Sequence, residues 1–368
     1  MNLSINQRFF LDLLKAGLWE TGVQLSKYDS INCLEIYEFA SGQAAVGLVT
    51  AGVEHDTDVN VPKDVVLQFV GTSVQFEQRN KAMNAFIAEI TRKLHNHSIN
   101  FVLVKGQGVA QCYERPLWRA CGDVDLLLDI DNYEKAKAFL KPLADDVAEE
   151  NVLTKHQALT IKGFDVELHG RMPFMLSKRA DEVIDEVING TTSGGQVRIW
   201  KLKESEIKLP SVDNDVILVF IHYLHHFFIE GVGLRQICDW CRLLWTYRTE
   251  INVELLEHRI QKMGLMTEWK VFASLAVNTL GMPVEAMPFY DSRFNKKGER
   301  VLERVLKSGN MGHNKDLSYR VKYKGMAYKV VSLWRRFCDF ASFVPIFPMD
   351  SPMFFMTYVV NKTKGSEE

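Results

Sequence analysis

Two carboxylates one residue apart inside an apolar run are the feature that most limits how this chain can fold. Asp123 and Asp125 lie within residues 122–128, where the side chains around them are apolar. Residues i and i+2 of a strand point to the same face, so the two carboxylates stand side by side, about 7 Å apart along the chain. Like charges that close raise each other's pKa unless a cation lies between them. A divalent metal is the simplest explanation, and hard oxygen ligands favour magnesium, which points to phosphoryl or nucleotidyl transfer.

Size and charge are those of an ordinary globular protein. The chain has 368 residues, of which 47% are hydrophobic and 24% charged, and its formal net charge is −2. This length allows two or three domains with a sizeable core. Because general nucleic-acid binders are strongly basic, we expect no sequence-specific nucleic-acid partner.

The sequence shows no sign of secretion or membrane insertion. The six cysteines are too few and too scattered for a disulfide framework. The first residues lack the basic-then-apolar order of a secretory signal. No window reaches about 18 uninterrupted apolar residues, so we expect a reduced, cytoplasmic protein without a membrane span.

The spacing of the apolar residues predicts three parts. Residues 1–97 are mostly helical in pattern, with Gly71 as a candidate break. Residues 98–205 alternate short strand and helix patterns, and residues 206–368 return to helix. We therefore expect an α+β fold, in which a small mixed β-sheet core is flanked by helical N-terminal and C-terminal regions.

The predicted core contains a hairpin, two further strands and two helices. Lys162-Gly163 marks the turn of the hairpin, and Asp131 is a plausible N-cap of the second helix. The expected strands are 100–106, 122–130, 156–161 and 164–169, with 197–200 as a further edge strand, and the expected helices are 108–113 and 131–140. In the C-terminal region we expect helices over 216–229, 235–247 and 253–262.

Further motifs accompany the aspartates, and together they carry a resemblance. They are Lys105-Gly106 at the end of one strand, Arg119 four residues before Asp123, Glu167-Leu168-His169 on a later strand, His222 or His226, and the run from Leu234-Arg235 to Asp239. With these motifs, over about residues 100–240, the chain resembles the polymerase-β-type nucleotidyltransferase superfamily. Within it, the chain looks most like an uncharacterised bacterial family with a Lys-Gly, Arg-x-x-x-Asp-x-Asp and Glu-x-His signature.

The resemblance implies a two-metal reaction. A nucleoside monophosphate would pass from an NTP to an acceptor hydroxyl, with release of pyrophosphate. Asp123, Asp125 and Glu167 would be the catalytic residues and would bind two Mg²⁺ ions. The nucleotide-binding residues implied are Lys105, Gly106, Arg119, Gly122 and His169. Given the near-neutral charge of the chain, a small molecule or a protein is the expected acceptor.

Some of these assignments have alternatives. Asp165 shares a strand face with Glu167 and is a rival third carboxylate. Arg119 could instead pair structurally with Glu114 or an aspartate, and Lys105 could be an exposed strand end.

Histidines and cysteines suggest other sites that we do not favour. His169 is expected to support the site by a hydrogen bond instead of acting as the base. His222 and His226 are spaced for zinc on a helix, but no further ligands complete a set of four. Cys238 and Cys241 match a redox motif, but they lie inside a helical pattern, so packing is the preferred interpretation.

One departure from the family pattern leaves the function open. Gln107 follows Gly106 where better-characterised members carry Ser or Gly, and the interval from Gly106 to Asp123 is longer than in minimal members. A non-catalytic nucleotide-binding or interaction module, or a metal-dependent small-molecule phosphotransferase, is therefore an alternative.

The C-terminal segment 334–356 is unusually apolar and aromatic. We expect a helix that covers the core, with a membrane-surface or protein contact as the alternative.

Overall fold

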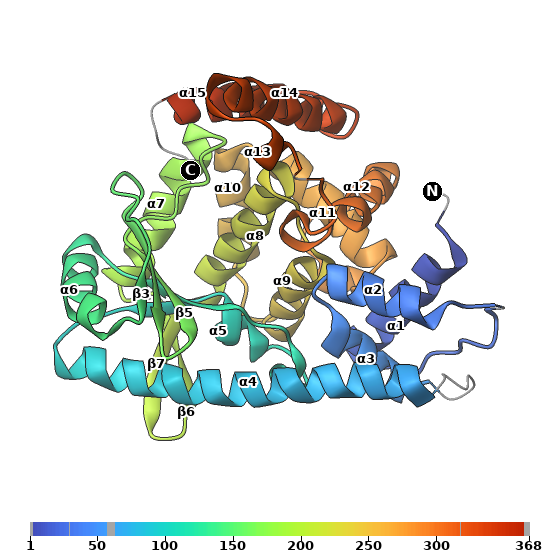
Figure 1. The fold of residues 1–368 in the computed structure, drawn as a ribbon, viewed down its shortest axis with the longest axis horizontal. Coiled ribbons are helices and arrows are strands. Elements are labelled where there is room, and N and C mark those ends of the chain that lie inside the picture. The colour runs from blue at the N-terminus through green and yellow to red at the C-terminus, as the bar shows by residue number, and fades with distance from the viewer. Residues whose placement is uncertain (1–2, 29, 57–62, 317, 364–368) are drawn as a thin grey trace.

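The computed structural model describes residues 3–28, 30–56, 63–316 and 318–363 (Figure 1). It confirms the α+β class, with a five-stranded mixed sheet and a separate two-stranded hairpin between helices at both ends of the chain.

The α-helices of the described residues come before, between and after the strands along the chain. They are α1 (Ile5–Trp19), α2 (Cys33–Gly42), α3 (Val46–Glu54), α4 (Lys63–Asn96), α5 (Gly106–Ala110), α6 (Ile130–Leu140), α7 (Lys178–Thr192), α8 (Val212–Ile229), α9 (Leu234–Thr246), α10 (Val253–Met263), α11 (Met266–Asn278), α12 (Asn295–Ser308), α13 (Tyr319–Lys322), α14 (Gly325–Phe343) and α15 (Asp350–Thr363). The strands are β1 (Val102–Val104), β2 (Asp123–Leu127), β3 (Asp146–Val147), β4 (His156–Ile161), β5 (Phe164–His169), β6 (Val197–Leu202) and β7 (Ser205–Pro210).

The main sheet has the strand order β1-β2-β5-β4-β3, and only β2 and β5 in it pair in parallel. Val124 and Leu126 of β2 belong to a core shared with α4 and α6. Because side chains alternate along a strand, Asp123, Asp125 and Leu127 take the opposite face. Leu127 packs there in the larger core, so the carboxylates lie beside the helices of that core.

Helix α4 runs along one whole edge of the molecule, from the sheet to the N-terminal helices (Figure 1). The candidate break at Gly71 is absent. Phe69 and Ser73 on either side of it are buried, and their packing outweighs the roughly 1 kcal/mol that a helical glycine costs.

Three local expectations were wrong. The short helix begins at Gly106 instead of 108. Asp129, not Asp131, is the N-cap of α6, because its side chain accepts the backbone N–H of Asn132 at 2.8 Å. Residues 197–202 pair with β7, which the sequence reasoning had not identified, instead of extending the main sheet.

The hydrophobic cores do not follow the three predicted parts. The larger core joins α1 and α3 of the N-terminal helices to α8, α9, α11 and α12 of the C-terminal ones. The smaller core lies between the sheet, α4 and α6. The boundaries near residues 97 and 205 therefore remain predictions.

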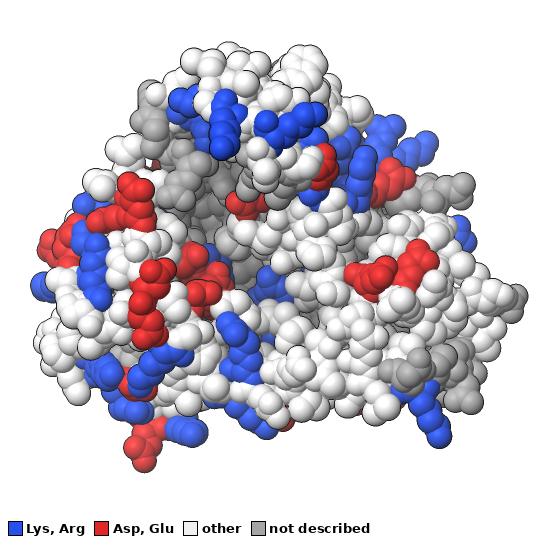
Figure 2. Space-filling view, viewed as in Figure 1, with Lys and Arg blue, Asp and Glu red and all other residues white. Residues whose placement is uncertain are grey.

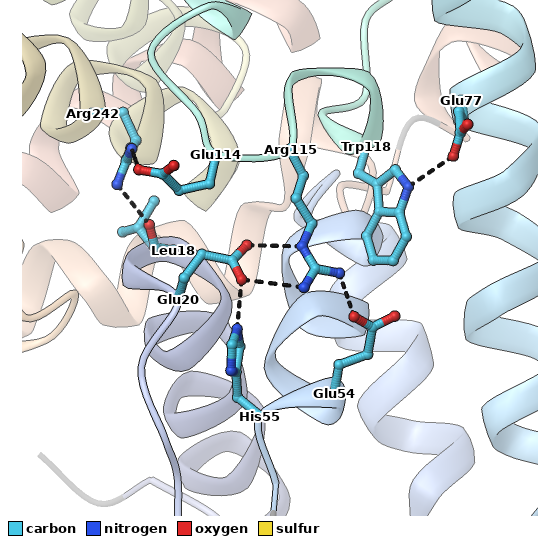
Figure 3. A network of polar contacts seen from close by, with 9 residues as sticks. All are labelled: Leu18, Glu20, Glu54, His55, Glu77, Glu114, Arg115, Trp118 and Arg242. Carbon is cyan, nitrogen blue, oxygen red and sulfur yellow. Dashed lines mark hydrogen bonds and ion pairs between the residues drawn. The ribbon is translucent and has the colours of Figure 1, made fainter.

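A loop between α5 and β2 is tied to the N-terminal helices (Figure 3). Arg115 forms ion pairs with Glu20, at 3.0 Å from Nε to Oε1, and with Glu54. The indole N–H of Trp118 donates to Glu77 of α4 at 3.1 Å. The loop leads directly into β2, so these contacts help to hold the start of that strand.

Among the described residues, no helix combines the length and the apolar character needed to cross a bilayer.

Helices α1 and α3 pack so closely that only glycine fits at their crossing. A Cβ on Gly17 would lie 1.8 Å from the carbonyl oxygen of Leu48, and one on Gly52 would lie 2.0 Å from that of Leu13. Both positions therefore need the absence of a side chain.

We expect Gly17→Ala to lower the free energy of unfolding by about 1–3 kcal/mol or more, because the two backbones must separate. The matched control is Gly71→Ala in α4, where a Cβ meets nothing within 4 Å. This control should be neutral or gain up to about 1 kcal/mol from helix propensity. Urea denaturation of both variants measures the difference, and equal effects would contradict the packing argument.

Candidate active site

The structure brings the three predicted metal ligands together. In the parallel pair, Asp125 lies opposite Glu167, and Asp123 lies two residues before Asp125 on the same face. One carboxylate oxygen from each of the three residues lies within 4.8 Å of the others.

The rival carboxylate Asp165 lies outside this cluster. It is exposed, and its Oδ1 accepts the hydroxyl of Thr160 on β4 at 3.1 Å. Among the described residues, Glu167 and not Asp165 completes the carboxylate group with Asp123 and Asp125.

Asp125 is the centre of the cluster and is buried. Its Oδ1 lies 2.8 Å from Nζ of Lys105 and 2.8 Å from Nε2 of His169. Burial alone would raise the pKa of Asp125, but the Lys105 charge and the His169 hydrogen bond hold it below its ordinary value. Lys105 is therefore engaged with the cluster and is not an exposed strand end.

The two basic partners of Asp125 both have raised pKa values. Burial would lower the pKa of Lys105, but the negative charges of Asp125, Asp123 and Glu167 raise it above its ordinary value. Burial would likewise lower the pKa of His169, and its hydrogen bonds to Asp125 and Glu167 reverse that effect. His169 thus makes the supporting hydrogen bond that the sequence reasoning expected.

The raised pKa of Asp123 indicates that Lys105 does not balance the negative charge of the carboxylates. The charge of Asp125, followed by burial, raises the pKa of Asp123, and the attraction of Lys105 does not offset this. A cation between the carboxylates would relieve this repulsion. The ligand atoms are all carboxylate oxygens, so the residues present fit a magnesium ion.

His156 of β4 is a site residue that the sequence reasoning missed. Its ring stacks on that of His169, with centroids 4.9 Å apart, and its Nε2 lies 3.3 Å from Oε2 of Glu167. Burial would raise the pKa of Glu167, but the hydrogen bonds of the two histidines lower it. The available signal was the predicted hairpin, since His156 and His169 are cross-strand partners in it.

The turn after β1 directs Lys105 towards the aspartates. Lys105 has φ +56° and Gly106 has φ +36°, a region that side-chain-bearing residues rarely adopt. A Cβ on Gly106 would lie 3.4 Å from the backbone oxygen of Asp123. Gly122, just before β2, is exposed, and a Cβ there would meet nothing within 4 Å.

Gln107, the departure from the family pattern, is buried in the contact between α5 and α4. Its Nε2 donates to Oδ1 of Asn80 at 2.9 Å, and Asn80 in turn donates to the backbone oxygens of Leu117 and Arg119. Gln107 therefore connects α5 to the loop before β2.

Arg119 forms the structural pair that was its alternative. Its Nε and Nη2 each donate to a carboxylate oxygen of Asp239 at 2.7 Å, and its Nη1 donates to Sγ of Cys121 at 2.7 Å. Tyr113 also donates to Asp239, at 2.7 Å. All three guanidinium nitrogens are thus engaged, and a phosphate contact by Arg119 stays a prediction that this pairing does not support.

Arg235 at the start of α9 is a further basic group beside the cluster. Its nearest acidic atom, Oδ2 of Asp239, is 3.6 Å away and already accepts Arg119. Its Nε is buried and has no hydrogen-bond partner among the described residues. The charge of Arg235 lowers the pKa of Asp123, so the guanidinium lies within electrostatic range of that carboxylate. Burial, followed by the charge of Lys105, lowers the pKa of His222.

The remaining histidine and cysteine motifs lie on helices α8 and α9. His222 and His226 contact each other edge to face, with centroids 4.4 Å apart, and His226 pairs with Glu230 at 2.7 Å. Neither belongs to a metal-ligand group among the described residues. Cys238 and Cys241 are buried free thiols of α9, and burial raises the pKa of both.

The face of the molecule seen in Figure 2 has a hollow between the sheet and helices α8 and α9. Figure 2 shows acidic side chains gathered on its sheet side and basic side chains near the helices.

Residues 29–281 match the profile of the uncharacterised nucleotidyltransferase family, and the chain belongs to this family. The matched region contains the carboxylate cluster together with α8 and α9. Comparison with curated proteins and with solved structures gave no match.

We expect Asp239→Asn to lower the free energy of unfolding by about 3–5 kcal/mol, because the buried charge of Arg119 loses its counterion. The matched control is Asp185→Asn, whose pair with Arg171 is exposed and should be worth at most about 1 kcal/mol. Urea denaturation measures both. If Asp239→Asn were as mild as the control, Arg119 would not depend on this pair.

Proposed function

We propose that the protein is a magnesium-dependent nucleotidyltransferase of the polymerase-β type. It moves a nucleoside monophosphate from an NTP to a hydroxyl of a small molecule or protein and releases pyrophosphate. The observation that carries this proposal is the group of three carboxylates, Asp123, Asp125 and Glu167, within 4.8 Å in a chain of a nucleotidyltransferase family.

In this proposal Asp123 and Asp125 hold two Mg²⁺ ions, and Glu167 completes the site on the acceptor side. When bound, the ions neutralise charge on the triphosphate and on the attacking oxygen. The carboxylate of Glu167, kept ionised by His156 and His169, accepts a hydrogen bond from the acceptor hydroxyl and orients it for attack. Lys105 orients Asp125 and provides positive charge beside the phosphates.

Arg235 is the residue that we assign to the triphosphate. It has a buried Nε without a partner among the described residues, and the nearby acid is shared with Arg119 and Tyr113. A guanidinium can contact two phosphate oxygens at once, which suits a triphosphate. In this assignment Arg235 has the nucleotide-binding role that the family resemblance implied for Arg119.

The rival functions differ in their products. A phosphotransferase would release a nucleoside diphosphate instead of pyrophosphate. A non-catalytic module would bind nucleotide without turnover. The burial of Gln107 against α4 weakens the case for a degenerate site, because its hydrogen bond to Asn80 gives this residue a packing role.

The proposal is tested by incubating the purified protein with Mg²⁺ and each labelled NTP, and measuring pyrophosphate and label on the protein or on added acceptors. Asp123→Asn/Asp125→Asn should lower the rate by about 10²–10³-fold or more, because metal-ion stabilisation is worth several kcal/mol. Asp165→Asn, exposed on the same strand face, should retain activity. Full activity in the double variant, or a nucleoside diphosphate as product, would refute the proposal.

Arg235→Ala should lower kcat/KM for the NTP by about 10–100-fold, since a hydrogen bond to a charged group contributes about 1.5–3 kcal/mol. Arg235→Lys should recover part of the loss by keeping the charge. Arg248→Ala, an exposed arginine just beyond the other end of α9, is the matched control and should be unchanged. Initial rates at varied NTP concentration decide this, and an unchanged kcat/KM in Arg235→Ala would remove Arg235 from the site.

A further inference from the structure

The outer side of α14 carries an unbroken apolar stripe. Met326, Val330, Leu333 and Phe337 follow one another at spacings of four, three and four residues, and Trp334 lies three residues before Phe337, which places all of them on one helix face. Each of these side chains is between 44% and 75% exposed. Trp334 and Phe337 stack on each other, with ring centroids 5.5 Å apart.

A second stripe follows on and just before α15. Met349, Met353, Met356 and Val360 repeat the same helical spacing, and Met349 is 80% exposed. Single exposed apolar residues are ordinary on protein surfaces, but stripes on two helices that pack together are not.

These stripes are not the sides by which the helices cover the core. Phe340 and Phe343 of α14 and Phe354 of α15 are buried, and all three contact the ring of Phe228 on α8. The two helices therefore satisfy the expected core-covering role with one face and still present a second apolar face.

The surroundings of the stripes are basic. Residues 319–363 contain seven Lys and Arg but two Asp and Glu, a net charge of +5 in a chain whose total is −2. Lys322, Lys324 and Lys329 are exposed at the start of this segment. In Figure 2 the surface of α14 and α15, at the top of the view, is mostly uncharged, and Lys and Arg lie along its lower margin.

The apolar stripes together with the positive charge distinguish between two candidate binding partners of this face, a second copy of the chain and a lipid bilayer. A second copy of the chain docked through the same face would bring two segments of charge +5 together, since a two-fold interface pairs a patch with itself. A bilayer with anionic lipids offers apolar depth for the stripes and negative charge for the lysines. No described helix is long and apolar enough to span a membrane, so the contact would lie on its surface.

We propose that the outer face of α14 and α15 binds the surface of membranes that contain anionic phospholipids. Trp334, Phe337 and the methionines enter the boundary between headgroups and acyl chains, and Lys322, Lys324 and Lys329 contact lipid phosphates. The face lies outside residues 29–281, and the inference does not depend on the proposed catalytic activity.

The test is co-sedimentation of the full chain with vesicles of phosphatidylcholine, with and without about 30% phosphatidylserine. We expect binding to the anionic vesicles that weakens with salt, and little to the neutral ones. Trp334→Ser/Phe337→Ser should weaken binding about tenfold or more. Leu67→Ser/Val70→Ser, an exposed apolar pair of the same spacing on α4, is the matched control and should bind normally.

A second variant keeps the proposal testable if the first one misfolds. Lys322→Glu/Lys324→Glu/Lys329→Glu should abolish the preference for anionic vesicles, whereas Lys135→Glu/Lys178→Glu/Lys201→Glu, at exposed lysines elsewhere, should not. Equal binding to both kinds of vesicle, or no binding to either, would overturn the proposal. So would a dimer in sedimentation velocity that Trp334→Ser/Phe337→Ser dissociates, because the face would then bind a second copy.

Discussion

The site depends on the register of one parallel strand pair. Pairing of β2 with β5 sets Asp125 opposite Glu167 and sends both side chains to the face away from the α4 and α6 core. A slip of one residue would turn Glu167 to the other face and dissolve the cluster. The register is held because Val124 and Val166, the neighbours of these acids, are fully buried on the apolar side. Apolar packing on one face of β2 and β5 therefore keeps the mutually repelling carboxylates together on the other face.

The helical regions also contribute side chains beside the carboxylate cluster. Helix α9 supplies Asp239, which holds Arg119 four residues before the first aspartate, and also Arg235, whose charge reaches Asp123. The start of α9 is itself held by Gln43 of the N-terminal region, whose side-chain oxygen accepts the backbone N–H of Leu234 at 3.0 Å. Parts from both ends of the chain therefore meet at the same side of the sheet, consistent with their shared core.

Much of the fold could be predicted from the sequence because its signals are local. An apolar run located β2, the Lys162-Gly163 turn located β4 and β5, and the helical spacing located α8, α9 and α10. Local competition explains the errors: Asp129 and Asp131 are both suitable caps, and the backbone geometry at the end of β2 selects Asp129. Strand β7, which pairs with β6 outside the main sheet, was not predicted.

The sequence by itself placed Asp123 and Asp125 on one face of a strand, because residue type and strand period are local properties, and the family resemblance implied Glu167 and Lys105 as their partners. Only the tertiary structure decided which acid completes the cluster, since Asp165 and Glu167 share a strand face but differ in what lies across from them. It also paired Arg119 with Asp239, left Nε of Arg235 without a hydrogen-bond partner among the described residues, and placed His156 beside Glu167. These pairings join residues far apart in the chain, and only packing brings them together.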